Sequence, residues 1–349
     1  MPQTTPASPG LVVVFSAGQP AFSVAAVGRD GSLVVGRGQQ AGLAVDDDLV
    51  SRGHARVVAG ESWLFEDLSS RNGTSVNGQP VLWPMRFARP LVARMGGTLV
   101  IPVEDTSLFA RGLVACSEGV RGPGLIAALD AVRVAGVTSR GFLFQAHAGS
   151  DVLAPARAFH ATRAMPGPFV DISGGDLPAG VVHEQVRLAV GGTLFLRDID
   201  LLGREAQREL VGSLGRLTSV RCCASTRLDL RAAIGSGQFR DDLLRLIATS
   251  TVRLPLLRER REEIPWLVAR QLEKLGDGFR VHASFIEACL LRAWPGNERE
   301  LKAEVRAASA RAMASGTLLL DVTHLGRSAG SLLAGHEETQ PRPLAALAS

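Results

Sequence analysis

Three short stretches near the N-terminus decide how the first part of this chain folds: GRG at 36–38, SRGHARV at 51–57 and SSRNGTSVNG at 69–78. Runs that favour β-strands flank them, with Gly, Asn and Asp at the joins. These runs are LVVVF (11–15), SLVVG (32–36), ARVVA (55–59), WLFEDL (63–68) and QPVL (79–82). The pattern predicts an antiparallel β-sandwich whose polar loops meet at one rim.

The loop side chains suit a phosphate ligand. A phosphorylated side chain carries about −1.5 to −2 charges and several acceptor oxygens. An arginine fork and a hydroxyl can meet these oxygens together. The alternative is a sandwich whose loop arginines are only solvated. One Gly-Arg pair would not decide between the two, but the ordered set of motifs favours a phosphate reader.

In order and spacing the three stretches resemble the forkhead-associated (FHA) domain, with its GR, SxxH, S/T-x-N-G-T and N-G motifs. The likeness covers residues 11–103 and implies binding of phosphothreonine peptides. The residues expected to bind the peptide are Arg37, Ser51, Arg52, Ser70, Arg71 and Asn72. By resemblance, Arg37 and Ser51 hold the phosphate, Asn72 bonds the peptide backbone and Arg52 assists at the rim. The residues expected to be structural are Gly36, His54, Gly73, Asn77 and Gly78.

Composition limits the remaining possibilities. A chain of 349 residues, 46% hydrophobic and 21% charged, is typical of a cytoplasmic protein with two or three globular domains. We expect no membrane span, because no apolar run is long enough. The four cysteines and seven histidines show no metal-ligand spacing, so we expect no metal site. A net charge of +4, with the basic residues spread out, gives no support for direct DNA binding.

From about residue 122, segments that favour helices and strands alternate, which predicts a parallel α/β sheet with crossover helices. The expected helices are LIAALDAVRVAG (125–136), LAPARAFHATRA (153–164), GVVHEQVRLAV (180–190) and REAQRELVGSLGR (204–216). The expected strands are GFLFQA (141–146), PFVDIS (168–173), GTLFLRDID (192–200) and VRCCAST (220–226). Helices follow in the last part, such as IPWLVARQLEKL (264–275) and ASFIEACLLRAW (283–294).

This second part resembles the AAA+ domain of sigma-54-dependent enhancer-binding proteins. The motifs that carry the likeness are ARAFH (156–160), GGTLFL (191–196), GQFRDDLLRL (237–246), LPLLRERREEIP (254–265) and WPGNERELK (294–302). We therefore expect a multidomain chain: an N-terminal all-β FHA sandwich, then an α/β AAA+ domain with a P-loop-like parallel sheet and a C-terminal helical lid. The expected boundaries are 11–103 for the FHA domain, 104–121 for a linker, 122–258 for the α/β part, 259–327 for the lid and 328–349 for a flexible tail.

The expected nucleotide site departs from the family pattern. An ATP-binding loop needs glycines that let backbone N–H groups face the phosphates, and a lysine. In AHAGSDVLA (146–154) Gly149 is kept, but Asp151 replaces a glycine and Val152 replaces the lysine. The chain's only lysines, Lys274 and Lys302, lie far downstream. We therefore expect no ATP or Mg²⁺ cofactor.

The metal-holding and sensor positions depart as well. Arg197 and Asp198 follow the strand 192–196 where the family has an acidic pair, and Arg227 replaces the sensor asparagine. We expect Arg197 to pair with Asp198 or with a neighbouring carboxylate. The resemblance also suggests that Arg240 and Arg245 reach a neighbouring subunit and that Arg299 is a lid sensor. The alternative, which we favour, pairs these arginines with local acids such as Asp241, Asp242 and Glu300.

Two further features of the family are missing from the sequence. No GAFTGA loop lies between the strands at 168–173 and 192–200, so direct sigma-54 contact is not expected. We also expect no helix-turn-helix after the lid. We expect a bacterial phosphothreonine-dependent signalling protein with a pseudo-ATPase domain, which acts in transcriptional regulation downstream of Ser/Thr kinases. Its expected partners are a phosphothreonine protein and related AAA+ activators or a second copy.

Two alternatives to this expectation remain open. One is a working ATP-dependent sigma-54 activator that holds nucleotide through non-standard residues. The other is a scaffold whose FHA loops no longer bind phosphate. Leu49, near the binding rim, indicates that the neighbouring specificity pocket is not strongly basic.

Overall fold

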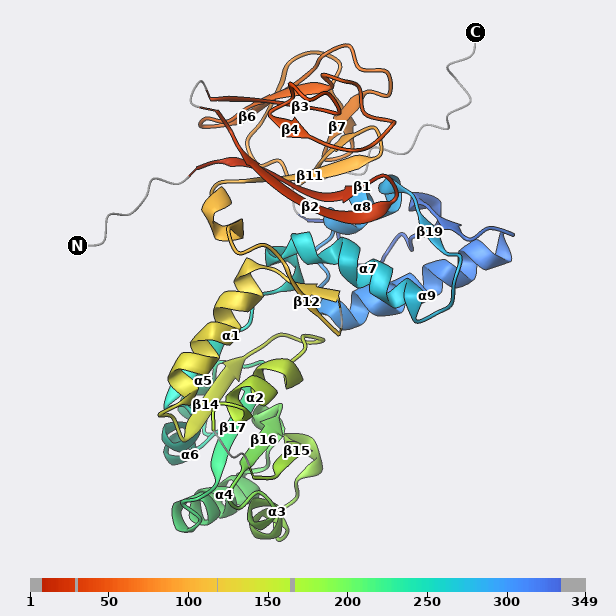
Figure 1. Cartoon of the computed structure of the whole chain (residues 1–349). Helices are drawn as coiled ribbons and strands as arrows, with labels where there is room; N and C mark the ends of the chain where they lie inside the picture. Colours follow the sequence, from red (N-terminus) through yellow and green to blue (C-terminus); the bar gives the residue numbers. More distant parts are fainter. Residues whose placement is uncertain (1–7, 29–30, 118, 164–166, 334–349) are drawn as a thin grey trace, which may run out of the picture.

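A computed structural model describes residues 8–28, 31–117, 119–163 and 167–333. It contains three parts, and the helical lid lies between the β-sandwich and the α/β part although it follows both of them in the chain (Figure 1). The β-sandwich and the parallel α/β sheet confirm the fold class expected from the sequence. The expected α/β strands and helices form, but several are shorter than expected. The strand expected at 192–200 ends at Arg197, and residues 199–201 form a 3-10 helix instead. The helix expected at 153–164 ends at His160, and residue 164 lies outside the described residues.

The FHA part is a sandwich of two sheets. One sheet has the order β2 (Gln19–Ala26), β1 (Gly10–Ser16), β11 (Thr98–Val103), β10 (Ala93–Met95), β7 (Thr74–Val76) and β8 (Gln79–Pro80). The other has the order β4 (Leu43–Ala44), β3 (Ser32–Gly36), β5 (Ala55–Val58), β6 (Trp63–Asp67) and β9 (Met85–Phe87). Alternate side chains of each strand face the core between the sheets, where Val35, Val57 and Phe65 are fully buried.

The segment 104–121, expected as a linker, has regular structure of its own. It contains the 3-10 helix η1 (Thr106–Phe109) and an antiparallel hairpin of β12 (Val114–Cys116) and β13 (Gly119–Arg121). The β13 strand lies against a helix of the lid, α7 (Ile264–Glu273). The connection between the FHA domain and the α/β part is therefore attached to the lid.

The α/β part is a five-stranded parallel sheet with the order β15 (Phe169–Ser173), β16 (Thr193–Arg197), β17 (Arg221–Thr226), β14 (Gly141–Gln145) and β18 (Ser250–Arg253). Its helices are α1 (Pro123–Gly136), α2 (Leu153–His160), α3 (Val182–Leu188), α4 (Arg204–Arg216), α5 (Leu230–Gly235) and α6 (Asp241–Ile247). Because the strands are parallel, their carboxyl ends share one edge of the sheet, where ligands bind in open α/β folds. Buried apolar side chains cover both faces of the sheet.

The lid consists of α7, α8 (Ala283–Leu290) and α9 (Asn297–Ala314), with a short parallel pair, β19 (Arg280–Val281) and β20 (Leu319–Leu320). The expectation of a flexible tail from residue 328 is wrong for residues 328–333. The Gly330 carbonyl accepts from the Ala293 amide over 3.0 Å, and the Leu333 amide donates to the Leu291 carbonyl over 3.1 Å. The remainder of that tail, 334–349, lies outside the described residues.

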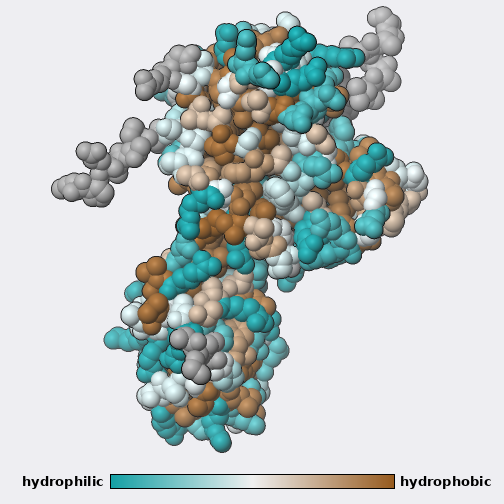
Figure 2. Space-filling view, in the orientation of Figure 1, coloured by the Kyte–Doolittle hydropathy of each residue, from teal (hydrophilic) through white to brown (hydrophobic). Residues whose placement is uncertain are grey.

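The FHA domain and the lid share one hydrophobic core. Strand β1 is buried on both faces: Leu11 and Val13 point into the sandwich, whereas Val12 and Val14 belong to the cluster formed by the lid helices. That cluster includes Phe285 of α8 and Trp294, both fully buried. Figure 2 shows hydrophobic side chains gathered where the sandwich meets the lid. The two parts are therefore packed as one body.

Among the described residues, no helix is long and apolar enough to cross a membrane. Within the same residues, no group of three or more His, Cys, Asp or Glu side chains could hold a metal ion. Cys222, Cys223 and Cys289 are buried thiols, and burial raises the pKa of Cys222 to about 12. These thiols stay protonated at neutral pH, as inert core residues do.

Candidate functional site

The FHA rim is built by close approach of two loops. The Arg37 amide donates to the Ser51 carbonyl over 3.0 Å, and the Gly38 amide donates to the Arg52 carbonyl over 3.0 Å. A Cβ on Gly36 would lie 2.1 Å from the Arg52 carbonyl oxygen, so only glycine fits there. The GRG motif thus holds the arginine beside the loop that carries Ser51.

A buried histidine braces the second and third loops. His54 is fully buried, and its Nδ1 accepts from the Ser51 amide over 3.0 Å. Nδ1 therefore carries no proton, and Nε2 donates to the Gly73 carbonyl over 3.1 Å. The SxxH motif sets the position of Ser51, and the imidazole ties it to the loop that carries Asn72.

The turn at 67–74 is organised by the Asp67 carboxylate. It accepts from the Ser70 amide at 2.8 Å, from the Ser70 hydroxyl at 2.7 Å and from Thr74 Oγ1 at 2.6 Å. Partial burial raises the pKa of Asp67, but the hydrogen bonds from Thr74 and Ser70 outweigh it and the net pKa is lowered. The Ser70 hydroxyl also accepts from the Gly73 amide over 3.0 Å. Ser70, expected in the peptide-binding set, is thus engaged within the turn.

The side chains of Asn72, Ser51 and Arg37 make further contacts at the rim. The Asn72 side-chain amide donates to the Leu49 carbonyl over 2.7 Å, and the Ser51 hydroxyl accepts from the Arg71 amide over 3.1 Å. The Arg37 side chain is 48% exposed and lies 3.7 Å from Asp48, a loose and solvated pair. Reorienting the Arg37 side chain toward a phosphate therefore costs little free energy.

The N-G motif closes a turn behind the rim. Asn77 and Gly78 have positive φ angles of 53° and 75°. The Asn77 side-chain oxygen accepts from the Leu91 amide at 2.7 Å and from the Val92 amide at 3.2 Å. These bonds hold the long connection before β10 against β7.

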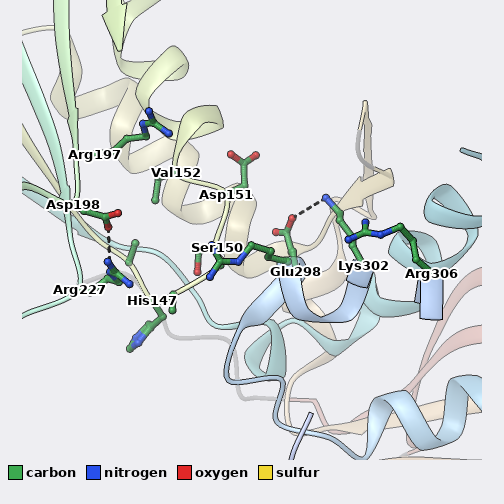
Figure 3. A pocket seen from close by; sticks show the side chains of 14 residues that line it. His147, Ser150, Asp151, Val152, Arg197, Asp198, Arg227, Glu298, Lys302 and Arg306 are labelled. Atoms are coloured by element: carbon green, nitrogen blue, oxygen red, sulfur yellow. Dashed lines mark ion pairs between the residues drawn. The ribbon is translucent and has the colours of Figure 1, made fainter. Parts of the chain in front are cut away.

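A second pocket, of about 480 Å³, lies between the α/β part and α9 (Figure 3). It contains the loop where the family pattern places the phosphates. Gly149 has a φ of +75°, and a Cβ there would lie 1.9 Å from the Gly296 carbonyl oxygen. The Arg299 amide donates to the Gly149 carbonyl over 3.3 Å, and the Asn297 side chain donates to the Ala148 carbonyl over 3.0 Å. The loop is therefore attached to the start of the lid helix.

An internal carboxylate occupies the amides at the start of α2. Asp151 Oδ1 accepts from the Leu153 amide over 2.9 Å and from the Ala154 amide over 3.2 Å. These are the N–H groups that a helix N-terminus offers to a phosphate. Val152 follows Asp151 and supplies no charge in the lysine position. The substitution of aspartate for glycine thus adds an internal anion as well as removing a flexible residue.

Three other charged residues that line this pocket, Arg197, Asp198 and Arg227, form ion pairs. Arg197 pairs with Asp171 over 2.8 Å, so the neighbouring carboxylate, rather than Asp198, is its partner. Asp198 pairs with Arg227 over 3.2 Å, which joins the altered metal-holding position to the altered sensor position (Figure 3).

One lining residue was missed by the sequence argument. Lys302 lies far from the loop in sequence but lines the same pocket from α9, where it pairs with Glu298 over 3.5 Å. Arg299 and Arg306 line the pocket from the same helix. A helical spacing of three and four residues from Arg299 could have indicated this cationic face.

The two arginines with a suggested trans role have local partners. Arg240 Nε donates to Asp242 over 2.9 Å, and Arg245 pairs with Asp241 over 2.7 Å. The Arg245 side chain remains 78% exposed. Arg240 is the N-cap of α6, and Arg245 lies in the last turn of this helix.

Comparison with known families agrees with this architecture. Residues 33–87 match the FHA domain family, and residues 141–257 match the family described as Sigma-54 interaction domain. The two parts of the chain thus match two different domain families, the FHA domain and the sigma-54 interaction domain.

The relatives of the second part are transcriptional regulators. The alginate biosynthesis transcriptional regulatory protein AlgB of Pseudomonas aeruginosa is 33% identical over 244 residues, which cover 59% of this chain and 54% of AlgB. The DNA-binding transcriptional regulator NtrC of Rhizobium meliloti is 34% identical over 175 residues, covering 40% of this chain and 36% of NtrC. The chain thus spans about half or less of the length of these relatives.

A solved structure supports the fold of the second part. The crystal structure of NtrX from Brucella abortus in complex with ATP matches with a TM-score of 0.52 and 22% identity. The match covers 58% of this chain and 55% of NtrX. At this identity the likeness shows the fold alone.

Proposed function

We propose that this chain is a phosphothreonine-dependent regulatory protein whose AAA+ part is a pseudo-ATPase, acting in transcriptional regulation downstream of Ser/Thr kinases. Its output is protein association rather than ATP turnover. Binding of a phosphothreonine protein draws the AAA+ body to that partner, to a related AAA+ activator or to a second copy. The cytoplasm is the compartment in which this function fits.

The phosphothreonine half of the proposal rests on the rim geometry. Arg37 is exposed with only a loose partner at 3.7 Å, Ser51 is fixed by His54, and Asn72 lies on the adjoining loop. Charge-assisted hydrogen bonds to phosphate oxygens are the strong interactions available to these groups. The two loops meet before any ligand arrives, which lowers the entropic cost of binding.

The pseudo-ATPase half of the proposal rests on one observation. The Asp151 carboxylate accepts hydrogen bonds from the Leu153 and Ala154 amides. A triphosphate would have to displace this internal anion while Arg197 and Arg227 remain paired with Asp171 and Asp198. Among the described residues that line this pocket, no two neighbouring acidic residues then remain to hold Mg²⁺ in the family manner. The pocket supports a fixed arrangement of the α/β part and the lid without nucleotide.

Contacts with sigma-54 and DNA are not part of this proposal. The described connection between β15 and β16 contains only η2 (Gly174–Asp176) and the seven-residue helix α3, which supports the absence of a GAFTGA loop. The spread of basic residues gives no support for a DNA-binding face.

The test compares phosphorylated and unphosphorylated threonine baits from the same peptide. Full-length protein, mixed with total protein from a cell that contains its kinase, is captured on each bait. We expect recovery of the chain with its partners only on the phosphorylated bait. Equal recovery from both baits would support a scaffold whose FHA loops no longer bind phosphate.

A second candidate function is an ATP-binding sigma-54 activator. The observation that favours it is the presence of Lys302, Arg299 and Arg306 in the pocket, because cations on α9 could face phosphates. It requires Asp151 to leave the α2 amides. Titration with ATP and Mg²⁺ separates the two functions, since only the activator predicts saturable binding.

A further inference from the structure

The groove beside Arg37 carries charges of both signs. It has a volume of about 820 Å³, and its lining includes Arg37, Arg52, Asp46 and Asp48. The two arginines suit a phosphate dianion, but the two carboxylates repel it. Phosphate binding alone therefore does not explain the composition of this groove.

Three successive aspartates have different positions. Asp47 is buried, with Thr98 Oγ1 donating to its Oδ2 over 2.9 Å and the Leu49 amide donating to its Oδ1 over 2.9 Å. Asp46 and Asp48, on either side, are exposed and line the groove. Asp47 therefore holds the loop in shape, and its neighbours are presented to a ligand.

Asp48 lies beside Arg37, the residue expected to hold the phosphate. Its side chain is fully exposed, and its Oδ1 lies 3.7 Å from the Arg37 guanidinium. When Arg37 turns to a phosphate, Asp48 loses this partner and lies near a dianion. A cationic side chain on the bound peptide would replace Arg37 as the partner of Asp48 and remove the repulsion.

We propose that Asp46 and Asp48 are specificity residues that select phosphothreonine peptides carrying a Lys or Arg beside the phosphothreonine. This inference rests on the proposed phosphothreonine binding and deepens it, because it names the peptide class. Exposed ion pairs are weak, so each carboxylate should favour a cationic peptide by about 1.5- to 5-fold. The preference should decline between about 0.05 M and about 0.5 M salt, as exposed charges become screened.

The experiment uses the full chain and a peptide library with phosphothreonine fixed and the flanking residues varied. Peptides with Arg, Ala or Glu at the most enriched flanking position are then titrated individually by fluorescence anisotropy. The protein variants are the double substitution Asp46→Asn/Asp48→Asn and, as a control that removes a carboxylate away from the groove, Glu61→Gln. Glu61 is exposed in the β5–β6 turn, at the other end of these strands from His54 and Asp67.

We expect the wild type and the Glu61→Gln variant to prefer the Arg peptide over the Ala peptide, and the double variant to bind the two equally. The double variant should also bind the Ala peptide at least as tightly as wild type does, because a repulsive charge is gone. That gain separates lost selectivity from a damaged fold.

Two results would overturn the inference while leaving the proposed function intact. One is phosphorylation-dependent binding without preference for a cation; the other is a preference that survives the double substitution. Binding that does not depend on phosphorylation would instead overturn the proposed function, and the inference with it.

Discussion

The Arg94 guanidinium of β10 donates from Nε to the Glu287 carboxylate of α8 over 3.0 Å, which ties the FHA sheet to the lid. Ser75 of β7 donates to the other oxygen of the same carboxylate over 3.3 Å. Strand β7 directly follows the loop that carries Asn72. The phosphopeptide rim is therefore connected by one strand to the lid that closes the second pocket.

Breaking this tie should destabilise the whole chain. Arg94→Ala leaves the buried Glu287 carboxylate without its cationic partner, and we expect a loss of about 3 kcal/mol in the free energy of unfolding. Arg56→Ala is the control, because its pair with Glu66 is more exposed and worth under about 1 kcal/mol. Urea unfolding followed by circular dichroism measures both. Equal losses for the two variants would show that the interface does not stabilise the chain.

Phosphothreonine binding should depend on Arg37. Hydrogen bonds to charged groups contribute about 1.5 to 3 kcal/mol, so Arg37→Ala should weaken a phosphothreonine peptide roughly 10- to 100-fold. Arg86→Ala, a change of an exposed arginine on β9, should leave the affinity unchanged. Isothermal titration of the two variants decides this, and an unchanged affinity for the Arg37 variant would contradict the site.

The GRG motif should tolerate no side chain at its first glycine. In Gly36→Ala the new Cβ would lie 2.1 Å from the Arg52 carbonyl oxygen, so the two loops must separate. We expect a loss of about 1–3 kcal/mol in stability together with weaker peptide binding. Gly53→Ala is the matched control for stability, since a Cβ at this position would lie 4.0 Å from Leu68 Cδ1. Thermal unfolding of both variants measures the difference.

Stability should depend on pH through Glu262, a buried residue of η5 (Arg261–Glu263). Burial, and then the charge of Glu263, raise the pKa of Glu262 from 4.5 to about 7. The folded state thus holds its proton more tightly than the unfolded state does. The stabilisation that comes from protonated Glu262 is therefore present in full below pH 4.5. It is lost as the pH rises through about 7, which lowers the free energy of unfolding by up to about 3 kcal/mol.

Glu262→Gln removes this titration. We expect the difference in unfolding free energy between pH 5 and pH 8 to be smaller in the variant by about 2 kcal/mol or more. Chemical denaturation at several pH values measures it. Parallel pH profiles for wild type and variant would show that another group is responsible.

Much of the fold followed from local pattern. The strands that flank the FHA motifs and the alternation in the α/β part have clear periods, so these elements could be placed before their contacts were known. Strands β2, β11 and β18 were not predicted. The shared FHA–lid core was not predicted. The sequence LVVVF (11–15) contained the signal for this core. A strand that is buried on both faces has an unbroken apolar run, whereas a strand with one solvated face alternates apolar and polar residues.

The candidate sites were only partly predictable. Motif spacing placed Arg37, Ser51 and Asn72 on neighbouring loops, because each motif lies where a strand ends. The Asp151 hydrogen bonds are local, because they come from amides two and three residues further along the chain. The place of Lys302 in the pocket depends instead on how the lid helix meets the loop, and the loop's own motif does not show this packing.

The most direct measurement is calorimetric titration of the full chain with ATP and Mg²⁺, with a phosphothreonine peptide as the positive control. We predict heat of binding for the peptide and none for ATP, because Asp151 already occupies the amides of α2. Saturable ATP binding that is lost on Lys302→Ala would contradict the pseudo-ATPase.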